Sequence, residues 1–235
     1  MGTPPTRSAG RLLRAAADLA LPMACAACGA GGASVCPGCL AEVVAALFVG
    51  GPRQVRPDPS PPGLVPVWAG GAYAGALARL IAAYKDGDRR DLRPLLVRLH
   101  QVVLAAAVRS VGPEVVAVPL PSSRRARRMR GDAPVGDLVG GSAQACDVRC
   151  VDSLMVCGQP ADQARLSATE RAVNLAGRIQ LRPGRRVAVA RTAAVILADD
   201  VITTGATIHE ASRAIRSEGG QVVAAAVLAA TPRQE

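Results

Sequence analysis

The sequence predicts an α/β domain built on a parallel sheet with helices on both faces, preceded by a small cysteine-rich module. From Leu64 onward, short aliphatic and β-branched runs alternate with longer helix-forming stretches, as in chains that form parallel sheets. The run at residues 194–198 contains no polar residue, which is typical of a strand buried on both faces. Four of the 7 cysteines gather within residues 25–39, before this alternation begins.

Length and composition limit the class of protein. A chain of 235 residues is long enough for one α/β domain with a proper core and a small appendage. Aromatic residues make up only 2%, so Ala, Val and Leu must supply that core. The formal net charge of +10 favours acidic ligands. However, Lys85 is the one lysine among 28 basic residues, and the Arg-, Ala-, Gly- and Pro-rich composition is typical of GC-rich coding, so part of this charge is expected to be solvated surface.

The N-terminal segment predicts a helix and no membrane span. Residues 8–20 fit a short amphipathic helix. The segment weakly resembles a signal peptide, but Asp18 interrupts its apolar part and the first cysteine pair begins where cleavage would fall. No stretch reaches the roughly 18 uninterrupted apolar residues that a membrane-spanning helix needs. We therefore expect a cytoplasmic protein. The apolar face of the predicted helix carries Leu12, Leu13, Ala16, Leu19 and Ala20.

The first four cysteines form two C-x-x-C pairs, Cys25 with Cys28 and Cys36 with Cys39. Two such pairs at this separation can place four thiolates around a tetrahedral Zn²⁺ ion. Disulfides fit poorly with an odd number of cysteines and no export signal, and a redox C-x-x-C does not need a second copy. The pattern predicts a closed, structural zinc site, with a docking or nucleic-acid-binding role for the module left open. The other cysteines lack ligand spacing and are expected to be buried apolar residues: Cys146, Cys150 and Cys157.

The remaining elements follow in order along the chain. Strands are expected at residues 65–70, 114–120, 151–156, 187–190, 193–198 and 221–229. Helices are expected at residues 40–48, 76–88, 92–109, 133–145, 168–178 and 206–218. The Pro/Gly-rich stretch at 50–63 breaks all periodicity and predicts a linker. We therefore divide the chain into a helix and zinc module at 1–50, a linker at 51–63 and an α/β domain at 64–235.

Residues 194–207 carry the strongest functional signal. The predicted strand ends in two adjacent carboxylates, Asp199 and Asp200, and a turn and a helix start follow at once. Free N–H groups of such a turn and the positive end of the helix suit a phosphate, and the carboxylates suit ribose hydroxyls. An ordinary capped α/β turn would need only one of these residues. The residues expected at the phosphate are Thr203, Thr204, Gly205, Ala206 and Thr207.

Two further segments carry candidate ligand contacts. An arginine run follows the strand end at Pro119; at the carboxyl edge of a parallel sheet it would face the ligand crevice, where guanidinium groups suit a pyrophosphate. A solvated basic helix face is the alternative for some of these arginines. Residues 159–175 predict a mobile lid followed by a capped helix. The residues concerned are Arg124, Arg125, Arg127, Arg128 and Arg130 in the run, and Gln163, Arg165, Arg171 and Asn174 in the lid.

The loop DDVITTGAT resembles the phosphoribosyl pyrophosphate (PRPP) loop of type I phosphoribosyltransferases. The whole chain resembles the ComF family of phosphoribosyltransferase-like proteins, which is associated with DNA uptake competence in bacteria. This resemblance rests on the four-cysteine knuckle, the Lys85 and Gly87 turn, the V-P-L-P strand end with its arginines, and the DDVITTGAT loop. It also rests on the spacing of Gln163, Leu166, Arg171 and Asn174. After Gly131 the family usually has an aromatic residue and an asparagine, where this chain has Asp132 and Ala133.

The resemblance implies a type I phosphoribosyltransferase fold that binds Mg²⁺ and PRPP. Pyrophosphate would leave as a nucleophile attacks the anomeric carbon of the ribose. The segment from Thr203 to Thr207 would hold the 5′-phosphate, Asp199 and Asp200 the ribose hydroxyls, and Arg124 or Arg125 the pyrophosphate. Two functions follow: a PRPP-dependent glycosyltransferase of unknown acceptor, or a non-catalytic accessory protein that keeps the fold and binds single-stranded DNA.

Overall fold

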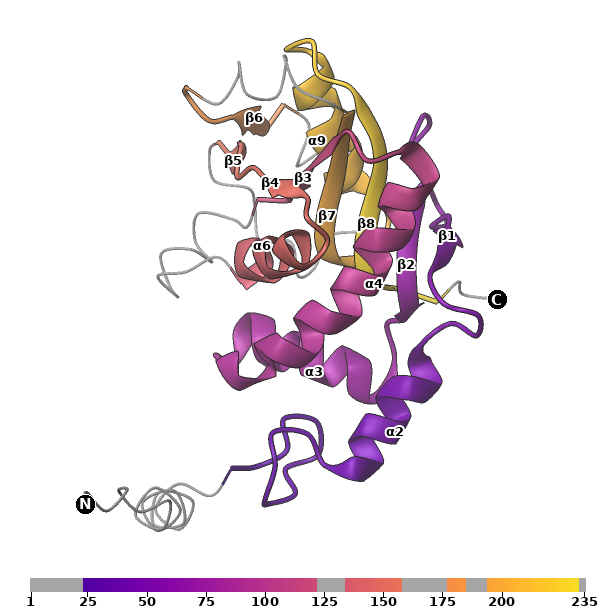
Figure 1. Ribbon diagram of the computed structural model, residues 1–235, viewed down its shortest axis with the longest axis vertical. Coiled ribbons are helices and arrows are strands. Elements are labelled where there is room, and N and C mark those ends of the chain that lie inside the picture. Colours follow the sequence, from indigo (N-terminus) through magenta and orange to yellow (C-terminus); the bar gives the residue numbers. More distant parts are fainter. Residues whose placement is uncertain (1–22, 122–133, 158–176, 185–193, 233–235) are drawn as a thin grey trace, which may run out of the picture.

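The computed structural model describes residues 23–121, 134–157, 177–184 and 194–232 (Figure 1). Several sequence predictions therefore lie outside the described residues. They are the helix at 8–20, the strand at 187–190 and most of the helix at 168–178. The arginine run (Arg124, Arg125, Arg127, Arg128 and Arg130) and the lid residues (Gln163, Arg165, Arg171 and Asn174) also lie outside.

A six-stranded sheet forms the centre of the described fold, in the order β1-β2-β8-β7-β3-β4. β1 is antiparallel to β2, and every other neighbouring pair is parallel. The predicted α/β class with a mostly parallel sheet is confirmed. The strands are β1 (Arg53–Val55), β2 (Val67–Ala72), β3 (Val115–Pro119), β4 (Arg149–Cys150), β7 (Ala194–Ile202) and β8 (Val222–Ala230).

The described helices cover both faces of this sheet (Figure 1). Along β7, Val195 and Leu197 pack in one apolar cluster with Ile208 of the last helix, whereas Ile196 packs on the opposite face with Leu104. This alternation is what a strand buried on both faces requires. The helices are α2 (Pro37–Ala46), α3 (Gly75–Asp86), the 3₁₀ turn η1 (Arg90–Leu92), α4 (Arg93–Val111), α6 (Pro134–Ala145) and α9 (Ala206–Arg216).

Two segments differ from the sequence prediction. β1 lies inside the Pro/Gly-rich stretch, where Gln54 pairs with Trp68 of β2; a strand of three residues at a sheet edge tolerates prolines close by. The strand predicted at 151–156 is shorter: β5 (Leu154–Val156) pairs with β6 (Ile179–Leu181) in a separate antiparallel sheet. Apolar runs of this length do not reveal which partner strand they will meet, because pairing depends on distant residues.

One helix of the described residues, Arg90–Val111, is long and apolar enough to cross a membrane by length and composition alone. It packs into the fold, because Leu96, Val103 and Leu104 are fully buried, as is His100, whose Nδ1 lies 2.7 Å from Oγ of Ser142. Core helices of soluble proteins pass the same test, so this helix is weak evidence for a membrane span.

Gly71 provides a test of this packing, because it lies where β2 meets the end of α2. A Cβ atom at Gly71 would lie 2.5 Å from the carbonyl oxygen of Ala46, a backbone atom that cannot rotate away. We expect Gly71→Ala to lower the free energy of unfolding by about 1–3 kcal/mol, the usual range for overpacking, in urea denaturation. Gly140 of α6 is the control, since a Cβ there meets no heavy atom within 4 Å. An equal loss in both alanine variants would contradict this packing.

Candidate functional site

The turn between β7 and α9 has the geometry of an anion-binding site. β7 ends at Ile202 and α9 begins at Ala206. Gly205 precedes the helix with φ of 78°, a left-handed conformation that glycine adopts freely. The first N–H groups of a helix have no acceptors within the helix, and the helix dipole is positive at this end. The turn therefore offers donors to a phosphate.

The side chains around this turn are small and polar. Thr203 is exposed, Thr204 and Thr207 are half-buried, and Ala206 is buried. Oγ1 of Thr204 accepts a hydrogen bond from the N–H of Ala206 at 3.4 Å. No acidic residue lies in the first turn of α9, so no carboxylate of that turn competes with an anion. The predicted order of strand, acidic pair, small-residue turn and helix is thus present.

Asp199 and Asp200 lie side by side near the end of β7 in different surroundings. Asp200 is only 4% exposed, whereas Asp199 is half-buried. The N–H of Asp200 donates to Oδ1 of Asp199 at 2.9 Å, and the N–H of Val201 donates to Oδ1 of Asp200 at 2.9 Å. The two carboxyl groups differ in exposure but lie close enough to interact, because the charge of Asp200 contributes to the raised pKa of Asp199.

Lys85, at the C-terminal end of α3, contacts the buried carboxylate. Its Nζ lies 3.0 Å from Oδ1 and 2.9 Å from Oδ2 of Asp200, while its side chain remains 41% exposed. Burial alone would lower the pKa of Lys85, but the charges of Asp200 and Asp199 outweigh it, and the pKa is raised. Burial, followed by repulsion from Asp200, raises the pKa of Asp199 well above its usual value, and Lys85 opposes that rise.

Sequence reasoning did not place Lys85 at this site. Two signals were present: a chain that uses arginine elsewhere keeps a single lysine, and Lys85 with Gly87 is part of the family resemblance. Its partner, Asp200, lies 115 residues further along the sequence, and local periodicity cannot predict a contact at that separation.

The four predicted metal ligands lie together. The sulfur atoms of Cys25, Cys28, Cys36 and Cys39 are all within 4.8 Å of one another. The N–H of Cys36 donates to Sγ of Cys25 at 3.4 Å, and this bond is the largest of several hydrogen bonds that together lower the pKa of Cys25 to about 6. Burial raises the pKa of Cys39 to about 12. Four sulfur donors at this spacing, with an N–H group directed at one of them, fit a tetrahedral zinc ion.

The cysteine module is attached to α3. Cys25 and Cys39 share an apolar cluster with Leu77 and Leu80 of that helix. Oε2 of Glu42 in α2 accepts hydrogen bonds from the N–H of Ala76 at 3.1 Å and from Nη2 of Arg79 at 2.8 Å. Glu42 thereby caps an N-terminus whose own N-cap residue, Ala74, makes no side-chain cap.

The remaining cysteines are half-buried instead of fully buried as predicted. Cys146 follows the end of α6, Cys150 ends the edge strand β4, and Cys157 follows β5. Because each of these cysteines lies at or just after the end of a helix or strand, one side of its side chain faces solvent. Sγ of Cys157 donates to Oε1 of Gln180 at 3.3 Å.

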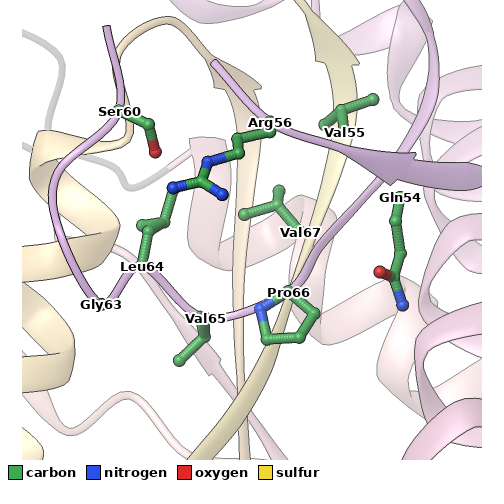
Figure 2. Close-up of a pocket in the computed structure, with 9 residues that line it drawn as sticks. All are labelled: Gln54, Val55, Arg56, Ser60, Gly63, Leu64, Val65, Pro66 and Val67. Carbon is green, nitrogen blue, oxygen red and sulfur yellow. The ribbon is translucent and has the colours of Figure 1, made fainter. Parts of the chain in front are cut away.

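A hollow of about 510 Å³ lies among residues 54–67 (Figure 2). Leu64 lines it and also approaches Gly205, where a Cβ atom would meet Cδ2 of Leu64 at 2.9 Å. The guanidinium of Arg56 extends over it, and Oγ of Ser60 is buried with no hydrogen-bond partner among the described residues. Sequence reasoning missed this hollow because it assigned the segment to a linker.

Comparison with known proteins gives one family match. The model of the phosphoribosyl transferase domain matches residues 145–235, a range that includes β7, the turn and α9. The prediction of a phosphoribosyltransferase-type domain is confirmed over this range. No curated protein matches the chain.

Several solved structures are similar to the chain at low identity. Adenine phosphoribosyltransferase from Rhodothermus marinus is 20% identical, with a TM-score of 0.40, over 82% of this chain and 86% of that one. The enzyme of the same name from Thermoanaerobacter pseudethanolicus is 17% identical, with a TM-score of 0.40, over 81% and 87%. An allosteric regulatory enzyme of purine biosynthesis is 16% identical, with a TM-score of 0.40; this chain spans only 30% of its length.

Metal content tests the cysteine site. We expect the purified protein to carry about one zinc ion per chain and Cys39→Ala to lose it, because a structural site of this kind needs all four ligands. Metal release should be accompanied by a lower melting temperature, since the cysteines pack against α3. Elemental analysis and thermal unfolding measure both. Cys157→Ala, outside the cluster, is the control and should keep its zinc; a wild-type protein without metal would contradict the assignment.

Proposed function

We propose that the chain binds PRPP at the β7–α9 turn and transfers its phosphoribosyl group to an acceptor. The observation that carries this proposal is the geometry at one end of β7, where the acidic pair is followed by a left-handed glycine that opens α9. The phosphoribosyl transferase domain match supports it, because the matched range includes both elements.

The 5′-phosphate of PRPP lies, in this proposal, over the start of α9. Backbone N–H groups from Thr203 to Thr207 donate to its oxygens, together with the hydroxyl groups of the threonines. Gly205 suits this role because a side chain there would be strained by its φ of 78° and would meet Leu64. A dianionic phosphate also gains from the positive end of the helix dipole.

The ribose hydroxyls point toward the acidic pair. A carboxylate accepts hydrogen bonds from two neighbouring hydroxyl groups without donating any, so Asp199 and Asp200 orient the sugar ring. Departure of pyrophosphate leaves positive charge on the ring, so positioning and electrostatic stabilisation supply most of the rate. The nearby negative charge of the carboxylates favours that transition state.

The remaining parts of the proposal come from segments outside the described residues. Arg124 or Arg125 would bind the pyrophosphate, and Gln163, Arg171 and Asn174 would cover the site as a lid. Mg²⁺ enters bound to PRPP and neutralises part of the pyrophosphate charge. The resemblance to the ComF family supports a cytoplasmic role connected with DNA uptake.

The second candidate is a non-catalytic accessory protein that binds single-stranded DNA. The net charge of +10 favours it, but an aromatic content of 2% leaves few side chains for stacking on bases. Two measurements distinguish these functions. Release of pyrophosphate from PRPP in the presence of candidate nucleobases supports transfer, whereas salt-sensitive DNA binding without turnover supports the accessory role.

Calorimetric titration with Mg²⁺ and PRPP tests the proposal. We expect Asp199→Asn to reduce affinity at least about tenfold, the order of magnitude for losing a charged hydrogen-bond acceptor. Asp147→Asn is the matched control, because Asp147 is an exposed turn residue after α6. Unfolding curves of both variants verify that each is folded. A wild-type protein that does not bind PRPP, or an Asp199→Asn variant that binds it equally well, would overturn the proposed function.

A further inference from the structure

We propose that Lys85 is a positioning residue of the phosphoribosyl site: its ammonium fixes the carboxylate of Asp200, so that Asp199 is the main acceptor for the ribose hydroxyls. This inference rests on the proposed function. It assigns unequal roles to two adjacent acids that the sequence pattern treats as equivalent.

The hydrogen bonds of the two carboxylates support unequal roles. In Asp200, Oδ1 accepts from the N–H of Val201 and from Lys85, and Oδ2 accepts from Lys85. In Asp199, Oδ1 accepts from the N–H of Asp200, and the carboxyl group also contacts that of Asp200. Because a carboxylate offers about four lone-pair positions, these contacts leave more free acceptors on Asp199 than on Asp200. Exposure agrees, since Asp200 is buried and Asp199 is half-buried.

Charge explains why a lysine is needed here. A buried carboxylate without a partner is strongly destabilised, and a second carboxylate beside it adds repulsion. The charged and titratable groups that interact with Asp200 are Asp199 on β7, Lys85 on α3 and His100 on α4; Asp86 on α3 acts on Lys85. Burial lowers the pKa of His100 to about 4, so this histidine is neutral near pH 7. Among the described residues, Lys85 is therefore the cation that offsets the acidic pair.

α3 holds Lys85 in place because both ends of the helix are fixed. At the N-terminal end, Glu42 of the cysteine module caps the helix through the N–H of Ala76. Along its length, Leu77, Leu80 and Tyr84 are buried. At the C-terminal end, Lys85 reaches Asp200 across the fold. Because the helix is fixed, the flexible side chain of Lys85 can keep its ammonium group against the carboxylate of Asp200 on β7.

A double-mutant cycle on affinity for Mg²⁺ and PRPP tests the role. We expect Lys85→Met to weaken binding at least about tenfold in the wild-type background and less than about twofold in the Asp200→Asn background, because contacting residues are not additive. Lys85→Arg should restore most of the affinity, since a guanidinium keeps the charge. Arg98→Met, which removes an exposed arginine from α4, is the control and should bind as the wild type does.

Equal losses in both backgrounds would overturn the proposal, because Lys85 would then contact the ligand independently of Asp200. No loss from Lys85→Met would overturn it as well. A ligand-free measurement separates this inference from the proposed function: in NMR titrations of the side-chain carboxyl carbons, Lys85→Met should raise the titration midpoint of Asp199 by about one pH unit or more, because Lys85 opposes the rise of its pKa. A wild-type protein that does not bind PRPP would overturn the proposed function. An unchanged titration midpoint in Lys85→Met would instead refute the stabilisation of the acidic pair by Lys85.

Discussion

The ion pair between Lys85 and Asp200 is the constraint on which the rest of the site depends. It joins the C-terminal end of α3 to the end of β7, two elements far apart in the sequence. A carboxylate that is 4% exposed needs a compensating charge, and the half-exposed lysine supplies it. Because the cysteine module caps and packs against α3, this pair also connects the predicted zinc site with the strand that carries the acids.

The turn after β7 gains its chemistry from its backbone more than from its side chains. The strand is buried on both faces, so its end is held rigidly, and the left-handed Gly205 redirects the chain into α9 within three residues. Such a turn directs N–H groups to one point without any charged side chain. A rigid strand, a fixed acidic pair and a helix start together give the preorganisation that the proposed binding of a small phosphorylated ligand needs.

Most of this architecture was predictable from local patterns. The helices predicted to start at residues 76, 92 and 206 begin within one residue of those positions, because long periodic segments carry a strong local signal. The clustering of the four cysteines was predictable because their spacing is local, whereas ligand binding by residues 199–207 stays a prediction. Features set by distant partners were not predictable: Lys85 against Asp200, the pairing of β1 with β2, and the separate sheet of β5 and β6.

The most direct measurement of the central claim is the change in backbone amide chemical shifts when ribose 5-phosphate and then PRPP are added to the labelled protein. The account predicts the largest changes at Thr203 to Thr207 with both ligands, because both carry the 5′-phosphate, and smaller changes at Asp199 and Asp200. Changes confined to the hollow at residues 54–67, or no change with either ligand, would contradict it.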